Sequence, residues 1–174
     1  MDVCRSGCTR GGSRAISAMT ARGATAAEHT GMGTAGPDES PGFLLWRVTL
    51  RWQRVIAAAL RPMGLTHVQF VLLASVWWLA SVAGEGPAQR RVADHAGTDP
   101  MMTSQVLRTL EGRGLITREL DPDDSRARRL GITSQGAELA KRAISVVEAA
   151  DGEFFAAAGE RRPLLRTLHR LAVD

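Results

Sequence analysis

The sequence predicts a mainly helical fold that also contains one small β-hairpin, an α+β fold, and three features support this prediction. Apolar residues recur every three or four positions in several long segments, which is the spacing of helices with one buried face. Capping residues and prolines stand where those segments begin. Two short segments with β-capable residues flank the turn-forming residues 121–125, which is typical of a hairpin.

The first 40 residues differ in composition from the rest of the 174-residue chain. They have low hydrophobicity, many glycines and no apolar periodicity, so burial cannot offset the entropy lost on ordering. We therefore expect a disordered tail at 1–40 and one domain at 41–174. Cys4 and Cys8 lie in the tail with no histidine at ligand spacing, which argues against a metal site. The alternatives for this pair are an inert role and redox sensing.

Two helices are expected at the start of the domain, over 42–61 and 67–82. Ser40 is expected to cap the first helix, and Pro41 follows it at the first helical position, where proline is tolerated. Thr66 and Gln69 form a capping box for the second helix, which is apolar on nearly every side, as a central buried helix would be. Its two adjacent tryptophans either fill the core or line a ligand cavity. Arginines line one face of the first helix, which is either solvated or holds an anionic partner.

Two short helices joined by a tight turn are expected next. The first covers 89–96, and Gly97 stands where a left-handed residue closes a helix. Asp99 is a cap for the second helix, and Pro100 stands at its first position. A glycine in the turn and small or apolar residues where the helices cross have the spacing that a helix-turn-helix needs.

The second of these helices has two distinct faces when successive residues are placed about 100° apart. Its buried face is expected to hold Thr103, Val106, Leu107 and Leu110. The outer face offers a hydroxyl, an amide and a guanidinium, the groups that read base edges and phosphates in the major groove of DNA. The candidate DNA-contacting residues are therefore Met101, Ser104, Gln105 and Arg108. An ordinary solvated helix face is the alternative interpretation.

A β-hairpin is expected after this helix, with strands at 115–120 and 128–133. The aspartates of its turn can bond to their own backbone, and Asp124 is expected to structure the tip. The basic residues at the tip are Arg126, Arg128 and Arg129. A basic hairpin directly after a helix-turn-helix is a wing, which contacts the sugar-phosphate backbone or enters a minor groove. Residues 87–133 are thus predicted to form a winged helix-turn-helix.

Two more helices are expected at 134–174. Thr133 caps a long one that runs to about Ala158, and a last one covers 162–173. The leucines of the last helix share one face, and they are Leu164, Leu165, Leu168 and Leu171. A single winged helix has nothing with which to cover the apolar stripes of such long terminal helices. We therefore expect these leucines to form a dimer interface with a second copy of the chain.

Several short motifs, in this order and spacing, resemble one known family. The matching pieces are Gly64-Leu65-Thr66, Gln69-Phe70, Val92-Ala93, Leu110-Glu111, Gly114-Leu115-Ile116 with Arg118, Asp124-Ser125-Arg126, and Ile132-Thr133 with Gly136. From about Phe43 to the C-terminus the chain resembles the MarR-type (multiple antibiotic resistance regulator) winged-helix transcription regulators. Two departures are Ile132, where leucine is usual, and Met101-Met102, which is bulkier than the usual small polar pair.

The resemblance implies a homodimeric, sequence-specific regulator, a repressor that binds an inverted-repeat operator in double-stranded DNA. In the family the first and last helices interlock in the dimer, and a small-molecule effector or oxidation modulates DNA affinity. The alternative is a winged-helix protein-interaction module, in which Met101 and Met102 contact a protein groove. Arg126 and Arg128 favour DNA binding over protein binding, because basic side chains on a wing can contact phosphates, whereas a protein-binding wing does not need them.

Charge and motif content limit the other function classes. The net charge is +4, but residues 83–133 carry eight basic and eight acidic side chains, so net charge by itself does not predict a nucleic-acid partner. The four histidines are scattered, and the sequence has no phosphate loop, nucleophile elbow or metal-binding helix motif, so we expect neither an enzyme nor a cofactor. Without a secretory signal or an apolar run of membrane length, we expect a cytoplasmic protein with no membrane partner.

Overall fold

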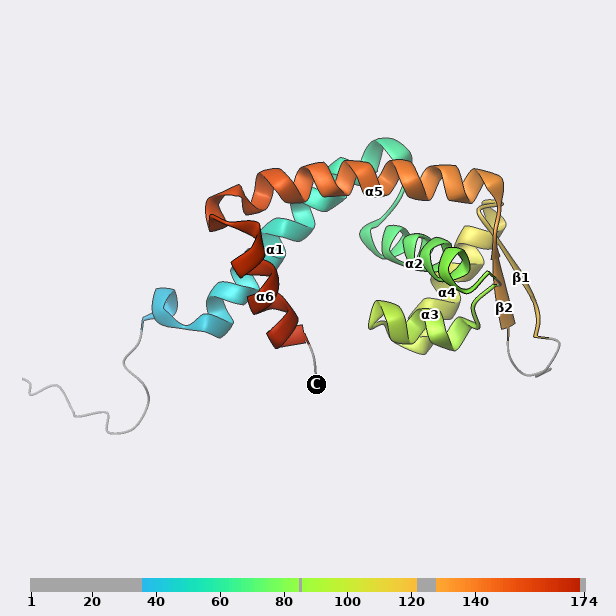
Figure 1. The fold of residues 1–174 in the computed structure, drawn as a ribbon, viewed down its shortest axis with the longest axis horizontal. Coiled ribbons are helices and arrows are strands. Elements are labelled where there is room, and N and C mark those ends of the chain that lie inside the picture. The colour runs from blue at the N-terminus through green and yellow to red at the C-terminus, as the bar shows by residue number, and fades with distance from the viewer. Residues whose placement is uncertain (1–35, 85, 122–127, 173–174) are drawn as a thin grey trace, which may run out of the picture. The chain divides into compact units, whose positions relative to one another are not determined.

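The computed structural model of the chain describes residues 36–84, 86–121 and 128–172. They form helices and one two-stranded sheet, so the predicted mainly helical α+β fold is confirmed (Figure 1). The helices are α1 (Pro41–Leu60), α2 (His67–Ala83), α3 (Gln89–Ala96), α4 (Pro100–Gly112), α5 (Ser134–Phe154) and α6 (Arg161–Ala172). The strands are β1 (Ile116–Leu120) and β2 (Arg128–Ile132), and the 3-10 turns are η1 (Pro37–Glu39), η2 (Arg61–Met63) and η3 (Phe155–Ala158).

The tail predicted for 1–40 lies mostly outside the described residues, and so do Cys4 and Cys8. Its last residues are described, because η1 precedes α1 and Arg47 of α1 pairs with Asp38 at 3.2 Å. Both side chains are mostly exposed, so this ion pair contributes little stability. The described domain begins at Gly36, slightly before the predicted start.

The predicted caps are present at the starts of α1, α2 and α5. The Ser40 hydroxyl accepts a hydrogen bond from a backbone N–H in the first turn of α1 at 3.3 Å. Thr66 and Gln69 form the capping box of α2, and Thr133 caps α5 at 3.0 Å. The prediction that one helix continues to Ala158 is wrong in its last turn, where the chain tightens into η3, as helix ends often do.

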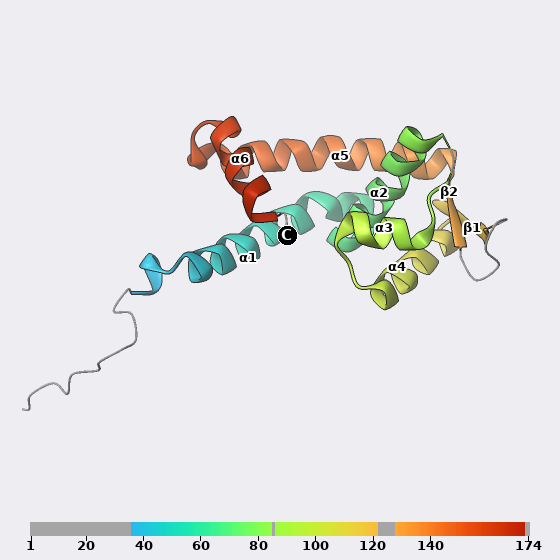
Figure 2. The ribbon, with the colours of Figure 1, turned by 60° about the horizontal axis from the view of Figure 1, so that its bottom comes forward.

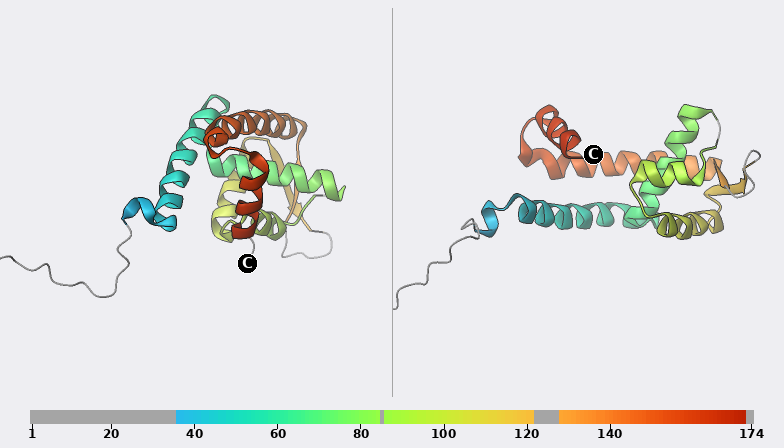
Figure 3. Two further views of the ribbon diagram at one scale, coloured as in Figure 1. Left: turned by 60° about the vertical axis from the view of Figure 1, so that its left-hand side comes forward. Right: turned by 90° about the horizontal axis from the view of Figure 1, so that it is seen from below.

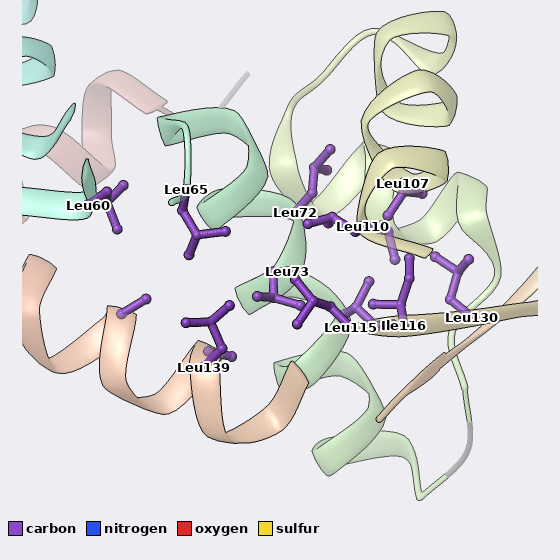
Figure 4. Close-up of a cluster of buried hydrophobic side chains, with 14 of the residues drawn as sticks. Leu60, Leu65, Leu72, Leu73, Leu107, Leu110, Leu115, Ile116, Leu130 and Leu139 are labelled. Carbon is purple, nitrogen blue, oxygen red and sulfur yellow. The ribbon is translucent and has the colours of Figure 1, made fainter. Parts of the chain in front are cut away.

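The core is assembled around α2, which packs against α1, α3, α4 and α5 (Figure 2). Helices α1 and α5 also lie against each other (Figure 3). Leucines, isoleucines and valines from these elements and from the hairpin form one buried cluster, part of which Figure 4 shows. The prediction that α2 is buried on nearly every side is wrong at its end, where Trp78 is 54% exposed and Val82 is 65% exposed. Trp77, by contrast, packs against the core.

The hairpin pairs residues 116–120 with 128–132 in antiparallel register. The linker before α3 joins this sheet, because Leu130 N donates a hydrogen bond to Pro87 O at 3.0 Å. A side chain at Gly86 would collide with the carbonyl oxygen of Leu130, so this close approach requires glycine. This additional pairing was not predicted from the sequence, and it fastens β2 to the chain that enters α3.

Among the described residues, no single helix is long and apolar enough to cross a membrane. The chain from Pro41 to Met63 and α2 meet that condition of length and composition when they are taken together, as a pair bent by 73°.

Candidate nucleic-acid interface

A rigid turn joins α3 to α4. Gly97 closes α3 in the left-handed conformation, with φ of 60°, as predicted. Asp99 then caps α4, and its Oδ1 accepts hydrogen bonds from the backbone N–H groups of Met101 and Met102, each at 2.9 Å. The fully buried hydroxyl of Thr103 donates to Asp99 O at 2.7 Å. These bonds close the first turn of α4, and Thr98 N, which donates to Ala93 O at 3.0 Å, holds the turn to α3. The predicted helix-turn-helix is confirmed.

Helix α4 presents a buried face and an exposed face. Thr103, Leu107 and Leu110 are fully buried, whereas Val106, predicted to be buried, is half-buried at the edge of the core. The exposed side carries three of the predicted contact residues, Met101, Gln105 and Arg108, and Met101 is 82% exposed. Ser104, the fourth, is half-buried beside them.

The described part of the wing places its arginines in different surroundings. Arg128 is exposed at the start of β2. Arg129 is half-buried, and its Nε lies 3.3 Å from Asp121 Oδ2, whose side chain is 10% exposed. The Arg129 side chain thus lies against Asp121 and is less open than that of Arg128. Arg126 and Asp124 lie outside the described residues.

Arg118 connects β1 to both helices of the helix-turn-helix. Its Nη2 donates to Gln89 Oε1 of α3 at 2.8 Å, and its Nη1 lies 3.4 Å from Glu111 Oε2 of α4. The Arg118 side chain is 13% exposed. From the sequence, Arg118 was noted as part of a motif. Its contact with Gln89 could not be predicted, because the two residues lie far apart in the chain.

Arg113, directly after α4, makes a second long-range contact that was not predicted. Its Nη1 donates to Gly64 O at 2.9 Å and lies 3.5 Å from Gln69 Oε1. Gly64 has the left-handed φ of 63° and ends the turn between α1 and α2. The end of α4 is thus tied to the turn that joins the first two helices.

The predicted dimer residues lie on α6, which packs against η3 within the described chain. Leu164 is half-buried, and the exposed members of the set are Leu165 at 39%, Leu168 at 41% and Leu171 at 75%. The first half of α1 is also open, and its large exposed apolar residues are Phe43, Leu44, Leu45, Trp46, Val48 and Leu50. Apolar surface of this extent on a folded chain is typical of an interaction site.

A small polar cluster joins α1, α2 and α5. Trp52 Nε1 donates to Asp151 Oδ1 at 2.7 Å, and the Trp52 and His67 rings meet edge to face with centroids 5.0 Å apart. Burial lowers the pKa of His67, and the negative charge of Asp151 opposes that shift. A separate open depression of about 590 Å³ is lined by Pro62 and Met63 and by residues of α5. Within the described ranges, no group of three or more acidic, histidine or cysteine side chains could hold a metal ion.

Comparisons with known proteins agree with this architecture. The sequence profile of the MarR family matches residues 65–127. The helix-turn-helix-type transcriptional regulator YdcH of Bacillus subtilis is 44% identical to this chain over 137 residues, which cover 79% of the chain and 92% of YdcH. The chain belongs to the MarR family.

Two solved structures extend the comparison within the MarR family. The Mycobacterium tuberculosis MarR-family protein Rv2887, solved in complex with DNA, is 34% identical with a TM-score of 0.61 and aligns over 77% of this chain and 98% of that one. CouR from Rhodococcus jostii RHA1, bound to p-coumaroyl-CoA, is 30% identical with a TM-score of 0.66, over 79% of this chain and 91% of that one. Both share the winged helix-turn-helix arrangement described above.

Proposed function

We propose that the protein is a homodimeric transcription regulator that binds double-stranded DNA in a sequence-specific manner and acts as a repressor. The observation that carries this proposal is the exposed face of α4, where Met101, Gln105 and Arg108 stand on a helix whose start is fixed by a capped turn. A helix held in this way can lie in a major groove and read base edges. The DNA complex of Rv2887 supports the proposal.

The residues of the interface take different roles in this proposal. Gln105 and Arg108 reach base edges or nearby phosphates, because an amide and a guanidinium form directional hydrogen bonds with both. Arg128 contacts the sugar-phosphate backbone, and so does Arg126, which lies outside the described residues. Arg129 supports the wing through Asp121 in place of the DNA contact expected from the sequence.

The proposed dimer is formed by α1 and α6 of two copies. Their open apolar side chains, including Leu165, Leu168 and Leu171, give the second copy a surface to cover. A two-fold dimer presents two α4 helices in opposite directions, so the operator should be an inverted repeat. Its half-site centres should lie about one helical turn, roughly 34–36 Å, apart.

A small ligand is proposed to modulate DNA affinity. The CouR structure with p-coumaroyl-CoA supports this part of the proposal, because that relative carries a small molecule on the same fold. A ligand changes DNA affinity to the extent that it binds the DNA-competent and DNA-incompetent conformations differently.

A protein-interaction module is the second candidate, and the exposure of Met101 at 82% and Met102 at 39% favours it. Methionine side chains are common at adaptable protein-binding surfaces. The two candidates differ in salt dependence, because DNA binding releases counterions from phosphates and an apolar protein contact does not.

The test is to select duplexes from a random pool with the purified full chain and to titrate the selected duplex at several salt concentrations. We expect an inverted repeat. The logarithm of the binding constant should fall linearly with the logarithm of salt concentration, with a slope of about −0.9 per phosphate contact. Recovery of no preferred sequence, or binding that does not change with salt, would overturn the proposal and favour the protein-interaction module.

A further inference from the structure

Arg118 occupies an unusual position for a charged side chain. Residues two apart in a strand share a face, so Arg118 lies on the same face of β1 as the buried Ile116, and its strand partner is the buried Leu130. The Arg118 side chain is 13% exposed, and its Nε has no hydrogen-bond partner among the described residues. An apolar side chain would fill this position without the cost of burying a guanidinium. Stability of the core therefore does not explain why arginine stands there.

The contacts of Arg118 indicate what the guanidinium does instead. It donates to Gln89, the first residue of α3, and reaches Glu111 in the last turn of α4. Arginine can serve both partners because its planar fork holds several donors in fixed directions, which a lysine ammonium does not. The bond to Gln89 is charge-assisted and short, at 2.8 Å, whereas the 3.4 Å contact to the half-open Glu111 carboxylate is weaker.

The two strands of the wing are fastened in different ways. Strand β2 is held to the body by a backbone hydrogen bond from Leu130 to Pro87 and by a bridge between Ala88 and Arg129. Strand β1 pairs with β2 in the sheet. Its first residue, Ile116, is buried in the core, and further along the strand Arg118 connects β1 to the helices. Loss of Arg118 would leave the outer part of the wing free to turn about its β2 edge.

We propose that Arg118 is a positioning residue for DNA binding, which holds the wing at a fixed distance and angle from α4 without itself contacting DNA. The inference rests on the function proposed above, because it concerns a wing and a helix that bind the same DNA duplex. Phosphate contacts form when the wing is already placed where the backbone passes, so a wing that turns freely loses them. Arg118 thus acts through Arg128 and the rest of the wing.

The test compares salt slopes for the selected duplex among variants of the full chain. Arg128→Ala removes a wing cation and should make the slope shallower by about one unit. Arg118→Met should make the slope shallower by at least as much, although its guanidinium is nearly buried. The double variant should lose less than the sum of the two, because Arg118→Met has already displaced the wing. A purely structural role would reduce the amount of active protein and leave the slope unchanged.

Three further variants control for misfolding of Arg118→Met and for a general effect of charge on the slope. Gln89→Leu removes the α3 partner, keeps every charge and should shift the slope in the same direction as Arg118→Met. Lys141→Met removes one positive charge from the exposed face of α5 and should leave the slope unchanged. If Arg118→Met does not melt cooperatively, Arg118→Lys takes its place. This variant keeps the positive charge but loses the planar guanidinium with its fixed donor directions.

The outcomes separate the two proposals. A wild-type slope for Arg118→Met and Gln89→Leu, with a reduced slope for Arg128→Ala, would overturn the role of Arg118 and leave DNA binding intact. Full additivity of Arg118→Met and Arg128→Ala would also overturn it. If the wild-type protein itself shows no salt-dependent binding to any duplex, the proposed function fails and the role of Arg118 fails with it.

Discussion

Replacing Leu168 by aspartate should separate the proposed dimer into monomers. Leu168 is 41% exposed on α6 in the isolated chain, and we propose that the partner covers this exposed part. The lost apolar burial is worth about 1 kcal/mol, and an unpaired carboxylate in its place costs about 2 kcal/mol or more. Two-fold symmetry applies this loss twice, so the dimer should weaken by about 6 kcal/mol, or roughly four orders of magnitude in its dissociation constant.

Sedimentation velocity over a range of protein concentrations measures this effect. Within the described chain, helix α6 has no buried residue and contributes none to the core, so α1–α5 should stay folded in the variant, which far-ultraviolet circular dichroism can check. Arg170→Gln is the matched control, because it lowers the charge by the same one unit from the opposite side of α6. A Leu168→Asp protein that sediments as a dimer at the same concentrations as the wild type would refute the interface.

The other predictions concern stability. Asp99→Ala should destabilise the domain by about 1 kcal/mol and lower its thermal midpoint by roughly 2–4 °C, since two backbone N–H groups lose their cap; an unchanged melting curve would contradict this. Gly136→Ala should destabilise the fold, because its new Cβ would collide with Leu115 O, whereas Gly152→Ala, which meets open space in the same helix, should stabilise it slightly; equal effects in chemical unfolding would show the close approach to be unimportant. Burial lowers the pKa of His67 below its ordinary 6.5, so the unfolded chain binds more protons and stability should decrease as pH falls below about 6.5. His67→Gln should reduce this dependence, and an unchanged pH profile of the unfolding free energy would exclude His67 as its source.

Local signals explain why the helix starts were predictable from the sequence. Ser40, Thr66, Asp99 and Thr133 each act on backbone groups within the next three residues, and all four caps are present in the structure. The buried face of α4 was predictable for the same reason, because helical periodicity relates residues three and four apart. The turn before α4 was predictable only in part. The Asp99 cap was evident from the sequence, but the hydroxyl contact between Thr98 and Thr103 that completes the turn was not.

Contacts between distant segments could not be predicted in this way. Arg118 reaches Gln89, and Arg113 reaches Gly64, but a sequence carries no periodic signal for a single long side chain that meets a partner across the fold. The surroundings of Arg129 were unpredictable for a related reason. Its position near the tip indicated a free cation, whereas its half-burial and its pairing with Asp121 depend on the twist and register of the hairpin.

The sequence pattern also could not predict how deeply residues at the ends of helices are buried. Trp78 continues the apolar character of α2, yet it is 54% exposed because the elements packed on α2 do not cover its last turns. The residues of α6 show the reverse case, since their pattern correctly indicated an apolar face that one copy does not cover. Which surface covers this apolar face depends on how copies of the chain assemble, and the Leu168→Asp experiment tests this.

The exposed face of α4 is proposed to read the DNA sequence. The decisive measurement is the binding of wild type and Gln105→Ala to a selected and a scrambled duplex. Specific sites are typically bound at least about 10³-fold more tightly than non-specific DNA, and we expect this for the wild type. Gln105→Ala should weaken binding to the selected duplex by about 1–3 kcal/mol and leave binding to the scrambled duplex nearly unchanged. Equal losses on both duplexes, or no loss on either, would show that Gln105 on α4 does not read the DNA sequence.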